Sequence, residues 1–134
     1  MVKPVDYILK FHEDFYQPIK SEIKEATTRA SSKPLNIDDF VIATFEPSDK
    51  LLLLRIDNHY ARRLKDLTRL EAKNEGYNHS DLLKHEIKNI YPELSDDDYV
   101  YIYQFSVIKE RAKTPLREFE ANYILNNGVW AVKQ

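Results

Sequence analysis

The segment IKSEIKEATTR, residues 19–29, carries the side chains of this sequence best suited to chemistry. Lys24, Thr27 and Arg29 offer an amine, a hydroxyl and a guanidinium where a helical pattern gives way to extended chain, so the three could converge at one turn. A hydroxyl becomes a nucleophile when a base takes its proton, and a guanidinium can stabilise an oxyanion. Taken alone, the segment also suits the more common case, in which Lys and Arg face solvent and Thr27 ends the helix.

Metal and cofactor chemistry has little support in the sequence. His79 and His85 lie six residues apart, and His85 with Glu86 lacks the second histidine of a zinc-protease helix. The chain has no cysteine and only two glycines, which excludes thiolate zinc sites and Gly-rich nucleotide loops. We therefore expect no metal site and no cofactor.

Two patterns could serve nucleic-acid binding. Tyr99, Tyr101 and Tyr103 share one face of an expected strand and could stack on bases, although aromatic residues on a central strand more often belong to the core. Residues 55–73 hold six basic and three acidic residues, among them Arg55, Arg62 and Arg63. This stretch could face phosphates, and an ordinary solvated surface explains the charge equally well.

Short strands and three helices must position these residues. We expect a strand at 5–11, then a helix whose stripe of Phe15, Ile19, Ile23 and Ala26 faces the core with Asp14 as its cap, and irregular chain over residues 27–34. The apolar runs 40–45 and 51–56 flank a turn and predict a hairpin.

Capping signals bound the next two helices. Thr68 and Glu71 have capping-box spacing, and Gly76 suits the left-handed residue that follows a helix, so Glu75 should end a short helix. Another helix should run from Ser80, turn its residues 83, 87 and 90 inward, and stop before Pro92.

The last third of the chain predicts strands. Residues 99–108 are apolar on both faces, as in a central strand, and residues 117–134 predict a hairpin that turns at 126–128. The strands lie too close together for regular parallel crossovers, so the pattern predicts an α+β fold with a curled sheet or small barrel.

Composition limits the function. A chain of 134 residues with 43% hydrophobic residues suits one compact domain, and a net charge of −2 disfavours a strongly basic nucleic-acid scaffold. No apolar run is long enough for a signal peptide or a membrane span, so we expect a cytoplasmic protein with no membrane partner. The oligomeric state is left open.

The order of five segments resembles the ASCH domain, a small relative of the PUA-type RNA-binding barrel, over about residues 7–108. IKSEIKEATTR resembles the family pattern Gly-x-Lys-x-x-Thr-x-Arg, and LTRLEAKNEGY resembles its Leu-Thr-x-x-x-Ala-x-x-Glu-Gly helix. DDFVIATFE, LLKHEIKNIYP and VYIYQF resemble its remaining strand, helix and closing strand. The resemblance implies a PUA-like small β-barrel at residues 1–108. Residues 109–134 lie outside the resemblance, and we expect them to form a basic connector and a hairpin extension packed on the same domain.

The resemblance is greatest to small bacterial amidohydrolases that remove the acetyl group of N-acetylcytidine. It implies that Lys24, Thr27 and Glu75 are catalytic and that Arg29 lines the same pocket. Two family glycines are replaced, by Glu22 and Asp38, so either the backbone has moved there or strain of about 1 kcal/mol is tolerated.

Two assignments of the chemistry are open. Thr27 could be the nucleophile, with Lys24 as its activator and Glu75 as a proton shuttle, which is what the resemblance implies. Alternatively, Glu75 could be the general base while protonated Lys24 and Arg29 polarise the carbonyl. A neighbouring carboxylate favours the ammonium form of Lys24, which opposes the first assignment.

We therefore expect a metal-independent amidohydrolase acting on an acylated nucleoside. The alternative is a non-catalytic module that binds single-stranded RNA or nucleotides, with Arg55, Arg62, Arg63 and Tyr103 as binding residues. A third hypothesis is a partner-binding protein whose terminal hairpin exposes Tyr123 and Trp130.

Overall fold

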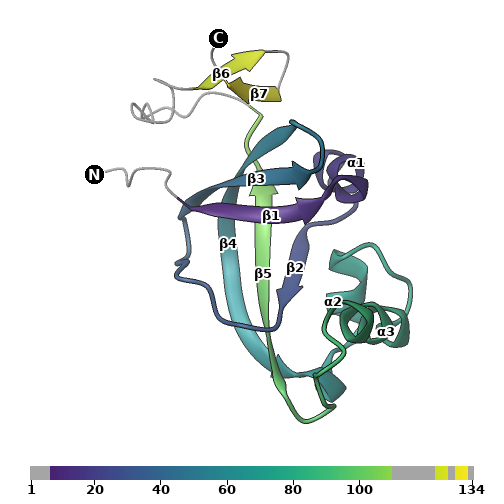
Figure 1. Ribbon diagram of the computed structural model, residues 1–134. Coiled ribbons are helices and arrows are strands. Elements are labelled where there is room, and N and C mark those ends of the chain that lie inside the picture. The colour runs from purple at the N-terminus through teal and green to yellow at the C-terminus, as the bar shows by residue number, and fades with distance from the viewer. Residues whose placement is uncertain (1–6, 110–122, 127–128, 133–134) are drawn as a thin grey trace.

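A five-stranded curled sheet forms the body of the protein, in a computed structural model that describes residues 7–109, 123–126 and 129–132 (Figure 1). Its strands lie in the order β1-β3-β4-β5-β2. Their bounds are β1 Ile8–His12, β2 Ala26–Arg29, β3 Phe40–Glu46, β4 Leu51–Arg63 and β5 Tyr99–Val107.

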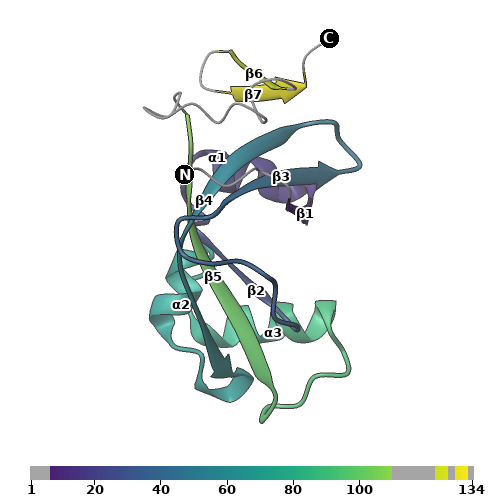
Figure 2. The same ribbon diagram turned by 90° about the vertical axis from the view of Figure 1, so that its left-hand side faces the viewer.

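The long strand β4 gives the sheet its curl. Its first residues pair with β3, and from Leu54 onward it pairs with β5, with a bulge between Ile56 and Asn58. A bulge bends the strand and increases its twist. As a result β1 and β3 cross one end of β4 and β5, whereas β2 lies along the other half (Figures 1 and 2). All pairs are antiparallel except β1 with β3. This half-barrel confirms the predicted α+β, PUA-like fold class.

The helices are short and occupy three places. The first pair, η1 Glu13–Phe15 and α1 Tyr16–Lys20, follows β1, and η2 Leu64–Asp66 follows β4. The helices α2 Arg69–Asn74 and α3 Ser80–Ile90 lie beside β2 (Figure 1).

The capping signals of α2 and α3 are confirmed. Thr68 and Glu71 form the capping box, Glu75 is the C-cap of α2, and Gly76 has φ +89°. Helix α3 ends two residues before Pro92.

The prediction of one helix over residues 15–26 is wrong. Helix α1 ends at Lys20, and Ile23, expected in the core, is 63% exposed. Residues 26–29, most of which were expected to be irregular, form β2 because they pair with β5. The predicted cap Asp14 is also wrong, since the side chain of His12 accepts the hydrogen bond from the Asp14 N–H.

Two clusters of buried side chains divide the core. The first lies under β1, β3 and the start of β4, with Phe11, Phe45 and Leu54 among its members. The second lies between β5, α2 and α3 and includes Leu64 and Ile87. Ala26 of strand β2 belongs to the second cluster.

Other predictions about the core need correction at two positions. Leu83 and Ile87 are buried as expected, but Ile90 is exposed near the end of α3. On β5, Tyr103 and Phe105 are buried in the core, whereas Tyr99 is exposed at the end of the strand.

The predicted terminal hairpin is present as β6 Tyr123–Asn126 and β7 Val129–Val132. Its turn at 127–128 and most of the basic connector lie outside the described residues, so the division at residue 108 stays a prediction. Within the described part of the chain, no helix is long and apolar enough to cross a membrane.

Candidate active site

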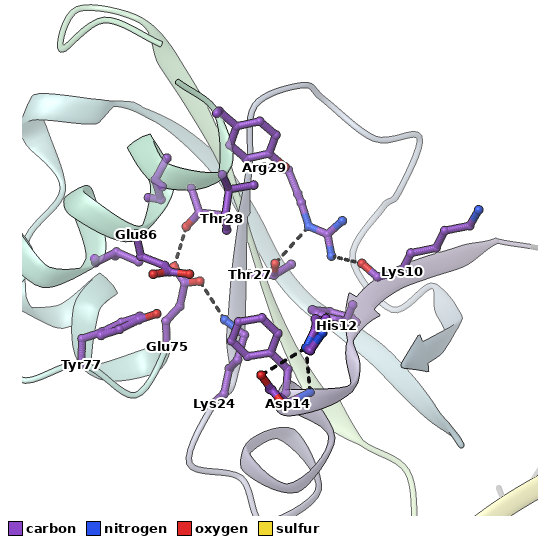
Figure 3. Close-up of a pocket in the computed structure, with 16 residues that line it drawn as sticks. Lys10, His12, Asp14, Lys24, Thr27, Thr28, Arg29, Glu75, Tyr77 and Glu86 are labelled. Carbon is purple, nitrogen blue, oxygen red and sulfur yellow. Dashed lines mark hydrogen bonds and ion pairs between the residues drawn. The ribbon is translucent and has the colours of Figure 1, made fainter. Parts of the chain in front are cut away.

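A cavity of about 550 Å³ opens between β1, β2 and the helices α2 and α3 (Figure 3). The four residues that the family resemblance assigns to catalysis and the pocket all line it: Lys24, Thr27, Arg29 and Glu75. Its apolar walls come from both core clusters, with Phe11 and Phe15 on one side and Leu83 and Ile87 on the other. The cavity therefore lies where the two halves of the core meet.

Backbone hydrogen bonds bring Lys24 and Glu75 together from distant parts of the sequence. The Glu25 N–H donates to the carbonyl of Asn74 at 2.6 Å, and the Phe105 N–H donates to the carbonyl of Glu25 at 3.0 Å. The loop before β2 is thus joined both to the end of α2 and to β5. Because Lys24 and Glu75 flank these bonded residues, their side chains enter the cavity close to each other.

Lys24 and Glu75 form a buried ion pair. Lys24 Nζ donates to Glu75 Oε1 at 2.9 Å, and the two residues are only 5% and 8% exposed. The ammonium also lies 5.1 Å from the centre of the Phe15 ring, a favourable cation–π distance. Burial strengthens the attraction between the two charges at a desolvation cost, and it makes the loss of either partner costly.

Thr27 and Arg29 form a second contact in the cavity. Arg29 Nε donates to Thr27 Oγ1 at 3.0 Å, and Arg29 Nη2 donates to the carbonyl of Lys10 at 3.0 Å. The guanidinium lies 4.8 Å from the centre of the Phe11 ring. Burial lowers the pKa of Arg29 from its usual value, and the negative charge of Glu75 is among the opposing influences. Thr27 accepts in this contact, so its own hydroxyl hydrogen can be given to another group.

Sequence reasoning assigned no role in the cavity to several other polar residues that line it, among them Thr28, Tyr77 and Glu86. Thr28 Oγ1 donates to Glu75 Oε2 at 2.5 Å. The pKa of Tyr77 is raised, first by burial and then by the negative charges of Glu86 and Glu75. The sequence offered only weak signals for a place in the cavity. Thr28 is next to Thr27, Tyr77 is next to Gly76, and Glu86 lies on the inner side of α3.

The three arginines predicted to bind nucleotides do not line this cavity. Arg55 is paired with Asp57 at 3.0 Å, and Arg62 is paired with Glu71 at 3.0 Å. Arg63 stacks on an exposed tyrosine ring near the far end of β4. The structure therefore separates these arginines from Lys24, Thr27 and Glu75.

Tyr103 lies in the core rather than in the cavity. It is 2% exposed, its hydroxyl accepts a hydrogen bond from the Lys33 N–H at 2.6 Å, and its ring stacks on His59. This environment agrees with the interpretation of the tyrosine face as packing.

The two replaced family glycines keep a glycine-like backbone. Glu22 has φ +66° and Asp38 has φ +71°, the left-handed region that disfavours side chains with a Cβ. Of the two alternatives that the sequence left open, the structure shows tolerated strain. Glu22 lies in the loop that carries Lys24, so its conformation helps to place the lysine.

Among residues 7–109 and the two short strands that follow, no three His, Cys, Asp or Glu side chains are grouped so as to hold a metal ion. The polar side chains that line the cavity carry ammonium groups, a guanidinium, an imidazole, hydroxyls and carboxylates. Such groups suit acid–base and nucleophilic chemistry.

No protein-family profile and no curated protein matches the sequence. Solved structures do match the fold. The ASCH domain of Lactobacillus crispatus JV V101 superposes with a TM-score of 0.65 at 11% identity and covers 77% of this chain and 80% of its own. The ASCH protein of Zymomonas mobilis gives 0.60 at 9% identity, over 95% and 86% of the two chains.

A DUF984 protein of Enterococcus faecalis V583 gives a TM-score of 0.59 at 16% identity, over 81% of this chain and 82% of its own. At such identities the likeness is one of fold. It agrees with the expectation drawn from the five sequence segments. The chain has the fold of the ASCH domain.

Proposed function

We propose that the cavity is the active site of a metal-independent amidohydrolase that removes an acyl group from a modified nucleoside such as N-acetylcytidine. One observation carries the proposal: Lys24, Thr27 and Glu75, which come from two distant segments, line one cavity, and Lys24 is ion-paired with Glu75. A potential nucleophile, a cation and a carboxylate in one water-limited site are the parts that amide hydrolysis needs.

The size and walls of the cavity suit a nucleoside. Its volume of about 550 Å³ falls within the range of about 300–1,000 Å³ that is common for small-molecule sites. Aromatic side chains of Phe11, Phe15 and Tyr91 line it and could contact the flat face of a base. Polar side chains, among them Lys24, Thr27 and Glu75, line the same cavity as these aromatic groups and could orient a reacting amide against a catalytic group.

The proposed first step makes Thr27 the nucleophile. In the resting state Lys24 is an ammonium and Glu75 a carboxylate. Transfer of one proton across their 2.9 Å hydrogen bond leaves a neutral amine on Lys24, and that amine then takes the hydroxyl proton of Thr27. Thr27 Oγ1 attacks the acyl carbon, and the proton on Glu75 passes to the departing nucleoside amine. The bond to Glu75 thus supplies the route by which Lys24 can lose its proton.

The second step regenerates the protein. Water attacks the acyl ester on Thr27 and gives one proton to the Glu75 carboxylate. The carboxylic acid leaves as the threonine oxygen takes a proton from Lys24, and the proton on Glu75 then returns to Lys24 across their hydrogen bond. Arg29 stabilises the oxyanion of both tetrahedral intermediates, because it already contacts Thr27 Oγ1 and carries further N–H donors. Every role in this scheme is filled by a group of the chain.

The alternative, a module that binds single-stranded RNA, would rely on Arg55, Arg62, Arg63 and Tyr103. The ion pairs of Arg55 and Arg62 reduce the charge they offer to phosphates, and Tyr103 is buried. These contacts favour the enzyme over the RNA-binding module, which becomes an outcome of the test below.

The test follows the absorbance change of acetylcytidine incubated with purified protein. We expect turnover by the wild type and a loss of at least about 100-fold in Thr27→Ala and in Glu75→Gln, with the fold retained in circular dichroism. Thr44→Ala and Glu93→Gln are matched controls, because neither residue lines the cavity. Unchanged turnover in Thr27→Ala or Glu75→Gln would remove that residue from the mechanism.

A parallel titration uses single-stranded RNA at several salt concentrations. Tight, salt-sensitive binding without any turnover would replace the enzyme with the RNA-binding module.

A further inference from the structure

Thr28 faces the opposite side of β2 from Thr27, and both residues line the cavity. Figure 3 shows Thr27 directed towards Arg29 and Thr28 directed towards Glu75. This division follows from the alternation of side chains along a strand, and it is possible here because β2 is an edge strand with the cavity along it. Neighbouring threonines therefore serve different partners.

Thr28 completes the set of hydrogen bonds around the Glu75 carboxylate. Lys24 Nζ donates to Oε1 at 2.9 Å, and Thr28 Oγ1 donates to Oε2 at 2.5 Å. All three residues are less than 9% exposed. A hydroxyl that donates to a carboxylate at this distance forms a charge-assisted hydrogen bond, which is shorter and stronger than a bond between neutral groups.

We propose that Thr28 is a positioning residue that fixes the Glu75 carboxylate and keeps it ionised, with Oε1 turned towards Lys24. For catalysis this inference rests on the proposed function, because it concerns the proton that Lys24 passes to Glu75. With Oε2 already engaged by the Thr28 hydroxyl, the oxygen ready to receive that proton is Oε1.

A neutral hydroxyl suits this role better than a second cation would. It stabilises the carboxylate through one directed bond and leaves Lys24 as the ammonium nearest to it in the cavity. Removal of the hydroxyl would leave Oε2 buried without this donor, and a buried carboxylate that has lost a donor is more easily protonated. A protonated Glu75 cannot accept the proton of Lys24, so Thr27 would no longer be activated.

The experiment compares Thr28→Val, which removes the hydroxyl at nearly constant shape, with Thr28→Ser, which retains it. We expect Thr28→Val to lower kcat/KM by about 10- to 100-fold, the effect of losing one hydrogen bond to a charged group. The acidic limb of its pH profile should move to higher pH by about one pH unit. Thr28→Ser should restore most of the rate and the wild-type profile, and Thr44→Val serves as the control for the same substitution outside the cavity.

A second readout does not need turnover. The carboxyl signal of Glu75 in protein labelled with ¹³C at the glutamate side-chain carboxyl is assigned by its loss in Glu75→Gln and followed against pH. We expect this signal to titrate at higher pH in Thr28→Val than in the wild type and Thr28→Ser.

The outcomes separate the two proposals. If the wild type shows no turnover while the Glu75 signal moves in Thr28→Val, the amidohydrolase is wrong and the contact between Thr28 and the carboxylate stands. If the wild type turns over and Thr28→Val matches it in rate and pH profile, the positioning role is wrong. An unchanged Glu75 titration in Thr28→Val also overturns it.

Discussion

Replacement of Lys24 by methionine removes one partner of the buried ion pair while keeping a side chain of similar length. Glu75 would then be a carboxylate that is 8% exposed and retains the Thr28 hydroxyl as donor but no cation at 2.9 Å. We expect Lys24→Met to lower the free energy of unfolding, because a buried charge without its counter-ion is strongly unfavourable.

The magnitude follows from the geometry. At 2.9 Å and an effective dielectric constant of about 20, the two charges attract each other by about 6 kcal/mol. The desolvation of both groups offsets much of this attraction, so the net effect is best judged from broken buried pairs, which cost about 3–5 kcal/mol. That is a large part of the roughly 5–15 kcal/mol by which domains are stable.

The assay is a double-mutant cycle in urea. Lys24→Met, Glu75→Gln and the double variant are each unfolded, and their free energies of unfolding are compared with that of the wild type. The double variant buries neither charge, and its glutamine can still accept from Thr28. We therefore expect it to be more stable than the sum of the single effects predicts, by about 2–3 kcal/mol.

Additive effects, within about 0.5 kcal/mol, would refute this reasoning. They would mean that water screens the two charges from each other. The cavity would then lack the low-dielectric environment on which the proposed proton transfer depends.

Three further predictions concern the backbone and the tyrosine of the site. In urea unfolding, Glu22→Gly should be more stable than Glu22→Ala by about 0.5–1 kcal/mol, because at φ +66° only glycine avoids the penalty of a Cβ; equal stabilities would contradict a strained backbone. In the same assay Gly76→Ala should cost about 1–2 kcal/mol through its φ of +89° alone, since the added Cβ would meet Ile23 Cγ2 at an ordinary 3.5 Å. The raised pKa of Tyr77 stabilises the folded state below about pH 10, and this contribution is lost as the pH rises through the higher folded value. Tyr77→Phe should therefore flatten the alkaline fall in the free energy of unfolding, and an identical pH dependence in the variant would contradict a raised pKa of the partly buried Tyr77 phenol.

Local signals predicted the parts of the fold that depend on local chemistry. Some residue types favour a helix end wherever they occur. They are the capping box of Thr68 and Glu71, Gly76 after α2 and Pro92 after α3. The hairpin of β3 and β4 and the central strand β5 were predicted from runs of apolar, β-branched and aromatic residues, because such residues favour strands.

Tertiary pairing explains the main errors. The stripe that predicted a helix through Ala26 is interrupted because Glu22 turns left-handed and Ala26 pairs with Gln104 of β5. Nothing within a few residues of Ile23 indicates that β5 will offer a free edge to this segment. An edge strand whose residue 26 pairs with residue 104, 78 positions away in the sequence, is beyond the reach of a local pattern.

The candidate site also contains residues that the sequence predicted and one that depends on tertiary structure. Lys24, Thr27, Arg29 and Glu75 were predicted to share a pocket through the resemblance to ASCH domains, and they line one cavity. Thr28 was missed because its role depends on the direction in which β2 presents it to the end of α2. That direction is set by the hydrogen bonds of the folded chain.

The most direct test of the central claim, that this cavity hydrolyses an acylated nucleoside amine, is to follow acetylcytidine by ¹H NMR in the presence of the purified protein. We expect cytidine and acetate to appear in equal amounts with the wild type, and neither to appear with Thr27→Ala. A spectrum that stays unchanged with the folded wild-type protein, or equal product formation by Thr27→Ala, would contradict the claim.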